Sequence, residues 1–96
     1  MQKGNEQDYH NLYDAILSLK TREECAALFE DLFTISEISA AVQRLKVAGM
    51  LFEKQTCNAV SELTGASTTT VSRVNKCLNY GAGGYRLVLE RMKKRN

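Results

Sequence analysis

Apolar residues recur along the chain at steps of three and four, the spacing of helices that bury one face. The pattern predicts a first helix over 8–19, a second after Thr21 and a long third helix after Thr34. Thr21 followed by Glu24 has the form of a capping box, in which each side chain satisfies a free backbone N–H at a helix start. The third helix carries its apolar residues on one side: Ile38, Ala41, Val42, Leu45, Ala48, Leu51 and Phe52.

Shorter helical segments follow residue 54, namely one from Thr56 or Cys57 to Thr64 and two more over 68–78 and 85–94. Gly65 is placed to end the first, because glycine adopts the left-handed conformation that closes a helix, and Ser67 is a favoured cap for the second. The residues expected to face inward are Val60, Leu63, Ala66, Val71, Val74 and Leu78. The chain contains no proline and no alternating strand pattern. The sequence therefore predicts an all-α fold of about six helices.

The 96 residues are the size of one domain, which we divide into helices over 1–53, a helix-turn-helix over 56–78 and a C-terminal helix over 85–94. The helices of 1–53 are rich in large apolar residues, which fits either an interface between subunits or the core of a monomer. Charge separates the two halves. Residues 1–53 hold five basic and nine acidic groups, net −4, whereas residues 54–96 hold eight basic and two acidic groups, net +6. A basic module on an acidic body favours a nucleic-acid partner.

Several classes of protein are disfavoured by what the chain contains. Its apolar runs are far shorter than the ~20 residues that span a bilayer, and its first residues lack an apolar signal region, so we expect a cytoplasmic protein without membrane contact. Cys25, Cys57 and Cys77 are too dispersed for a zinc site, and we expect small apolar fillers without a bound metal. His10 is the single histidine, and no nucleotide-binding loop follows a strand, so we expect no catalytic residues and no enzyme.

The segment 57–78 has the spacing of a helix-turn-helix, the motif that places its second helix in the major groove of DNA. Gly65 permits the tight turn, and Ser61 is small where the two helices must approach closely. Short hydroxyl and amide side chains can reach base edges and phosphates, and basic side chains can contact phosphates. The residues expected to contact DNA are Asn58, Ser67, Thr68, Thr69, Thr70, Ser72, Arg73, Asn75 and Lys76. The alternative is a helical hairpin in a core with a polar turn.

From Thr34 to Leu78 the chain resembles the Trp repressor superfamily, and as a whole it resembles the Trp-repressor-like proteins of the YerC/YecD family. The resemblance runs through LFTISEISAAVQRLKVAGMLFEK and ELTGASTTTVSRVNK, and it includes the glycine run with the final helix. It implies an intertwined homodimer of six-helix subunits, with two reading heads on successive major grooves of double-stranded DNA. The helix before the turn supplies further DNA contacts in the family, and here it offers Cys57, Asn58 and Ser61.

The resemblance also implies an effector site that binds tryptophan in the Trp repressor. Arg44 and Arg73 match the two arginines that hold the ligand carboxylate there, and Thr34 matches a threonine of that site. Val74 stands where the Trp repressor has a glycine that leaves room for the indole, and Cys77 stands where it has a serine. We therefore expect no cofactor and no response to tryptophan. Either another small anionic corepressor binds, or the arginines serve DNA and ion pairs.

The sequence is compatible to different degrees with three classes of function. The first is a sequence-specific DNA-binding transcriptional regulator, a repressor by resemblance. The alternative is a replication or nucleoid accessory protein or a protein-interaction module without operator control, which the resemblance implies through the related helical core of the replication initiator's DNA-binding domain. The third, an enzyme, lacks a candidate site in the sequence.

Overall fold

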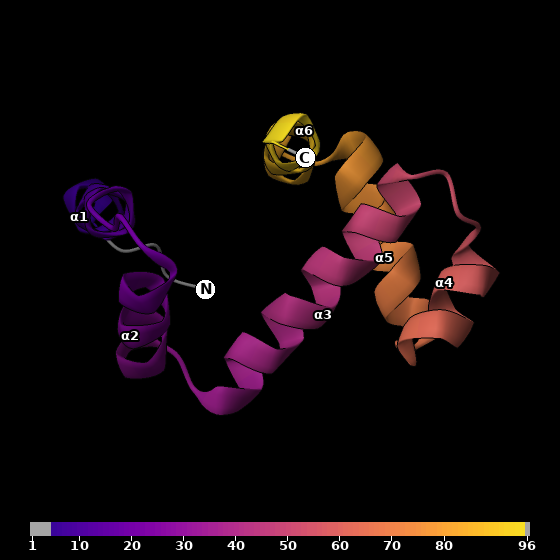
Figure 1. The fold of residues 1–96 in the computed structure, drawn as a ribbon, viewed down its shortest axis with the longest axis horizontal. Coiled ribbons are helices and arrows are strands. Elements are labelled where there is room, and N and C mark those ends of the chain that lie inside the picture. Colours follow the sequence, from indigo (N-terminus) through magenta and orange to yellow (C-terminus); the bar gives the residue numbers. More distant parts are fainter. Residues whose placement is uncertain (1–4, 96) are drawn as a thin grey trace. The chain divides into compact units, whose positions relative to one another are not determined.

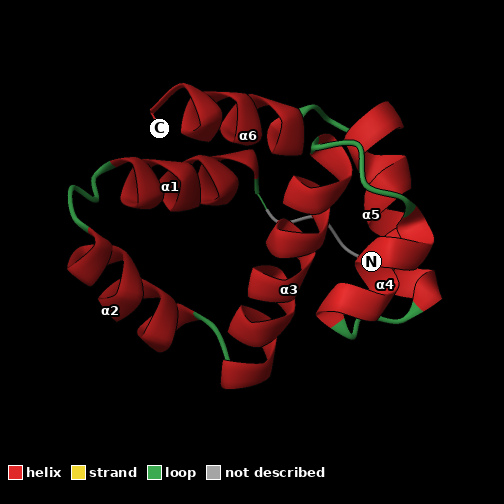
Figure 2. Cartoon of the chain, turned by 45° about the vertical axis from the view of Figure 1, so that its right-hand side comes forward, coloured by secondary structure: helices red, strands yellow, loops and turns green. Residues whose placement is uncertain are grey.

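The computed structural model describes residues 5–95, which form six helices and no strand (Figures 1 and 2). In chain order they are α1 (Glu6–Leu17), α2 (Arg22–Leu32), α3 (Ile35–Phe52), α4 (Cys57–Thr64), α5 (Thr68–Tyr80) and α6 (Gly84–Arg95). The predicted all-α class is confirmed. The chain divides into two compact units, one up to Ile35 and the other from Ser36 onward. The single domain predicted for 1–96 stays a prediction.

The first unit consists of α1 and α2, and neither helix contains a fully buried residue. Asn5 caps α1 by accepting a hydrogen bond from the Gln7 N–H at 2.7 Å. Thr21 caps α2 as the capping box predicts, with its hydroxyl accepting from the Glu24 N–H at 3.1 Å. The carboxylate of Glu24 accepts from the Lys20 N–H, one residue before the N-cap residue itself.

The second unit has a core formed by the C-terminal half of α3 together with α4 and α5. Its buried residues are Val47, Ala48, Leu51, Val60, Ala66, Val71, Val74 and Leu78. Met50, Phe52, Tyr85 and Leu89 pack against this cluster, and the last two bring α6 onto it. Four buried valines in a cluster this small make its packing sensitive to the loss of single methyl groups.

The prediction that Leu63 faces inward is wrong, and part of the apolar stripe of α3 is exposed. Leu63 is 66% exposed, because the buried side of α4 is centred on Val60 and the half-buried Thr64, and Leu63 lies at the edge of that side. Along α3 the predicted stripe is buried at Ala48 and Leu51, whereas Val42 is 62% exposed. Full burial on α3 is therefore confined to its C-terminal half in the single chain.

Helix α3 ends in a Schellman motif that turns the chain toward α4. The Lys54 N–H donates to the Leu51 carbonyl at 3.0 Å, and the Gln55 N–H donates to the Met50 carbonyl at 3.2 Å. Lys54 adopts φ 71°, a left-handed conformation that glycine takes more easily than lysine. The motif supplies partners for the last carbonyls of α3 where the helix reaches the core.

The helices and the cysteines also test the predictions about membranes, metals and apolar fillers. Within residues 5–95, no helix is both long and apolar enough to cross a bilayer, and no cluster of three or more metal-ligating side chains occurs. The cysteines are free thiols, but Cys57 and Cys77 are exposed, so the prediction that all three are apolar fillers is wrong for these two. Cys57 is the first residue of α4, and Cys77 is not among the buried residues of α5. Both thiols therefore lie outside the core.

Candidate nucleic-acid interface

The turn between α4 and α5 is closed by side chains as well as by glycine. Gly65 adopts φ 76°, and its N–H donates to the Ser61 carbonyl at 2.9 Å, as the predicted C-cap requires. The Ser61 hydroxyl donates to the Ala66 carbonyl at 2.7 Å, and the Ala66 N–H donates to the Thr64 hydroxyl at 3.1 Å. Both polar backbone groups of the buried Ala66 are therefore satisfied within the turn.

Helix α5 begins where this turn ends, and its two sides differ sharply. The Ser67 hydroxyl accepts from the Thr70 N–H at 3.1 Å, which is the predicted N-cap. Val71, Val74 and Leu78 bury one side of the helix in the core. The anchored apolar side fixes which residues of α5 face outward.

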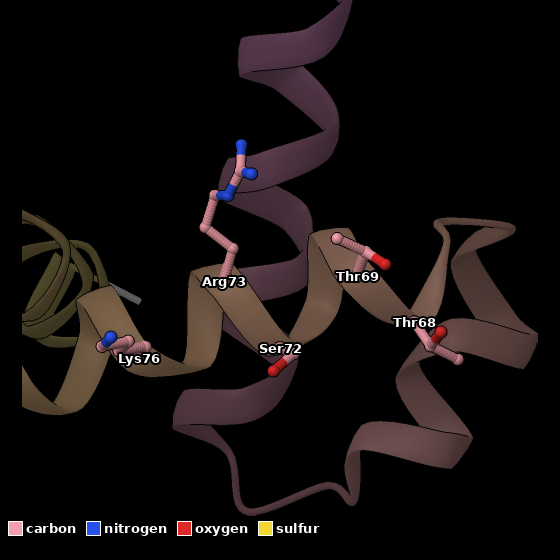
Figure 3. A pocket seen from close by; sticks show the side chains of 5 residues that line it. All are labelled: Thr68, Thr69, Ser72, Arg73 and Lys76. Carbon is pink, nitrogen blue, oxygen red and sulfur yellow. The ribbon is translucent and has the colours of Figure 1, made fainter.

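An open surface depression of about 590 Å³ lies along the outward side of α5. It is lined by Thr68, Thr69, Ser72, Arg73 and Lys76, all five of which are exposed. Figure 3 shows the two threonines near the start of the helix, and Arg73 and Lys76 further along it. Small hydroxyl groups near the N-terminus of a helix suit base edges. Cations further along the helix suit phosphates. We call these five residues the α5 face.

The structure places the other predicted DNA-contacting residues outside the α5 face. Thr70 is half-buried, and its hydroxyl accepts from the Ser67 hydroxyl at 3.0 Å, so both side chains serve the start of the helix. Asn75 is half-buried and bonds to Asn79. Asn58 is exposed on α4. Contacts of these four predicted residues with DNA stay predictions.

Two residues that sequence reasoning missed connect α5 to α6. Arg86, in the first turn of α6, donates from Nη2 to the Leu78 carbonyl at 3.3 Å and to Asn79 Oδ1 at 3.4 Å. Asn79 lies seven residues after Ser72 and thus on nearly the same side of α5, a spacing that could have drawn attention to it. No signal in the sequence pairs Asn79 with Arg86, because the contact depends on how the chain turns at the glycine run.

The predicted effector residues are distributed over several environments. Arg44 and Arg73 are exposed on α3 and α5, Val74 is 1% exposed in the core, and Thr34 belongs to the first compact unit. Cys77 lines a mainly apolar pocket of about 580 Å³. The other residues of that pocket are Leu45, Gly81, Ala82, Gly83, Gly84, Tyr85 and Val88. The joint role predicted for the five effector residues stays a prediction.

Comparison with known proteins gives consistent matches over nearly the whole chain. The family described as Trp repressor protein matches residues 7–93. The uncharacterized protein YerC of Bacillus subtilis strain 168 is 50% identical over 92 residues, covering 96% of this chain and 86% of YerC. The crystal structure of a TrpR-like protein from Eubacterium eligens ATCC 27750 is 49% identical, with a TM-score of 0.87 and coverage of 93% of this chain and 92% of that one. A candidate Trp repressor from Staphylococcus aureus is 42% identical with the same TM-score, covering 93% and 89%.

Proposed function

The chain belongs to the Trp repressor family, a family of DNA-binding helix-turn-helix regulators, and we infer that it is a sequence-specific transcriptional repressor. The observation that carries the inference is the α5 face, whose hydroxyl groups and cations stand outward on a helix anchored in the core. In the proposed complex α5 lies in the major groove of double-stranded DNA. Thr68, Thr69 and Ser72 meet base edges, and Arg73 and Lys76 meet phosphates.

The repressor acts as a homodimer in this proposal, so that two copies of α5 read two halves of one site. Support comes from apolar side chains that the single chain leaves exposed in both of its units. They are Tyr13, Leu17, Leu32, Phe33, Ile35, Val42, Leu45, Val88 and Met92. Exposed apolar side chains in this number are typical of a surface that another subunit covers. Light scattering on the protein as it elutes from a size-exclusion column should give twice the 10.8 kDa mass of one chain. The mass of a single chain would overturn the dimer.

The proposed effector is a small anion other than tryptophan. Arg44 and Arg73 offer guanidinium groups, which match the two oxygens of a carboxylate. Val74 packs in the core, and by the resemblance it stands where the Trp repressor has a glycine, so its branched side chain would take the space of an indole. Thermal unfolding with and without ligand tests the proposal. A shift with small carboxylates and none with tryptophan would support it, and a shift with tryptophan would overturn it.

Selection from genomic DNA tests the proposed function as a whole. The purified protein is incubated at physiological salt with fragmented DNA of its own source, and the recovered fragments are sequenced. Enrichment of a short two-fold-symmetric site upstream of a few genes is the expected result. Broad coverage of the genome or clustering at a replication origin would instead indicate the accessory function without operator control. Recovery of DNA no higher than in a control without the protein, both with and without added small carboxylates, would refute DNA binding.

A further inference from the structure

Arg86 joins the start of α6 to the last turn of α5. It donates to the Leu78 carbonyl, which belongs to the group of carbonyls at a helix end that lack a partner within the helix. Its guanidinium carbon lies 5.7 Å from the centroid of the Phe52 ring, at the end of α3. Arg86 is thus positioned by α3 and α5 together while it donates to Asn79.

Donor and acceptor chemistry settles the orientation of the Asn79 amide. A guanidinium group has only donors, so the atom of Asn79 that faces Arg86 must be the oxygen. The nitrogen of Asn79 then faces back along α5, where it donates to the Asn75 carbonyl at 3.0 Å and to Asn75 Oδ1 at 3.2 Å. A backbone carbonyl only accepts, so this second contact agrees with the first.

The orientation of the Asn79 amide also determines the orientation of the Asn75 amide. Because Asn79 presents an N–H donor, the atom of Asn75 that receives it must be Oδ1. The Nδ2 group of Asn75 is the part of its amide left for other partners. An asparagine recognises adenine by turning its oxygen and its nitrogen toward the base together, whereas the Asn75 oxygen is turned toward the Asn79 amide.

We propose that Arg86 and Asn79 are positioning residues that fix Asn75 as a hydrogen-bond donor toward DNA. The proposal rests on the proposed function. Asn75 then contacts an acceptor, either a phosphate oxygen or the N7 and O6 atoms of guanine, and does not read adenine. The amide is held before DNA arrives, so little side-chain entropy is lost when the contact forms.

Asn79→Asp separates this role from a structural one. Aspartate keeps an acceptor for Arg86 and makes that contact charge-assisted, which offsets the loss of the hydrogen bond to the Asn75 carbonyl, so the melting temperature should change little. It has no donor for Asn75 Oδ1, so the Asn75 amide can turn its nitrogen toward the new carboxylate. Affinity for a duplex carrying the selected site should fall by about fivefold per reading head, the loss expected for one hydrogen bond.

The added negative charge is controlled in two ways. Asn79→Asp is also measured in the Asn75→Ala background, where no amide remains to reorient. Tyr80→Asp adds the same charge at the neighbouring position, whose side chain is 86% exposed. The expected result is that Asn79→Asp weakens binding more in the wild-type background than in the Asn75→Ala background, whereas Tyr80→Asp has the same effect in both.

Each outcome is decisive. An equal loss for Asn79→Asp in both backgrounds, with wild-type protein bound to the duplex, would overturn the positioning role alone. Failure of the wild-type protein to bind any duplex would overturn the proposed function and this inference together. Asn75→Ala distinguishes the acceptors: uniform weakening across sequences indicates phosphate, and a lost preference for guanine at one symmetric pair of positions indicates the base. A lost preference for adenine would refute the donor assignment.

Discussion

Lys76→Gln removes one cation from the α5 face and should change how DNA binding depends on salt. Lys76 is exposed on the same side of α5 as Thr68, Thr69 and Ser72, so a helix in the major groove brings its ammonium group toward the backbone phosphates. Each phosphate contact releases counterions and contributes about 0.9 to the slope of log K against log salt. A dimer carries two copies of Lys76, so the slope of the variant should be smaller by about 1.8.

This slope gives a concrete magnitude. When salt is raised from 50 to 200 mM, the ratio of the wild-type affinity to the Lys76→Gln affinity should fall by about 12-fold. Fluorescence anisotropy of a labelled duplex carrying the selected site measures both slopes. Lys93→Gln is the matched control, because it removes the same charge from a side chain that pairs with Glu53 at 3.7 Å and lies outside the α5 face. Equal slopes for Lys76→Gln and wild type, or an equal decrease in Lys93→Gln, would refute the assignment of Lys76 to a phosphate.

Three further predictions concern the helix ends that position α5, and chemical denaturation measures all of them. Lys54→Gly relieves the left-handed conformation at the end of α3 and should raise the free energy of unfolding by about 1 kcal/mol; no gain would show that the lysine is unstrained. Ser61→Ala removes the donor to the Ala66 carbonyl and should lower it by about 1 kcal/mol, whereas an unchanged value would mean that water replaces the hydroxyl. Gly81→Ala places a Cβ against the Cys77 carbonyl oxygen and should lower it by about 1–3 kcal/mol, and a neutral result would contradict the close approach.

The turn of the helix-turn-helix was predictable because its causes are local. A glycine that must be left-handed and a serine that caps the next helix act over three or four residues, and the structure has both at the expected places. The buried side of α5 was also predictable, since Val71, Val74 and Leu78 follow helical spacing. Such features depend on a residue and its near neighbours in the chain, so the sequence contains most of the information.

Features that depend on distant neighbours were not predictable in the same way. Leu63 has the spacing of an inward residue, but no other part of the second unit covers that edge of α4. The sequence predicts one apolar stripe along the whole of α3, yet the single chain fully buries residues only in the second half of the helix. The link from Arg86 through Asn79 to Asn75 depends on the direction in which α6 leaves the glycine run, which the sequence pattern does not specify.

The central claim is that the α5 face reads bases, and the most direct test is to repeat the selection with Thr69→Ala. Thr69 is exposed on that face and can offer both a hydroxyl and a methyl group to a base edge. The account predicts that the enriched site keeps its two-fold symmetry and spacing but loses its base preference at one symmetric pair of positions. Thr69→Ser, measured alongside, shows whether the methyl group carries that preference. An enriched site identical to that of the wild-type protein would contradict the claim.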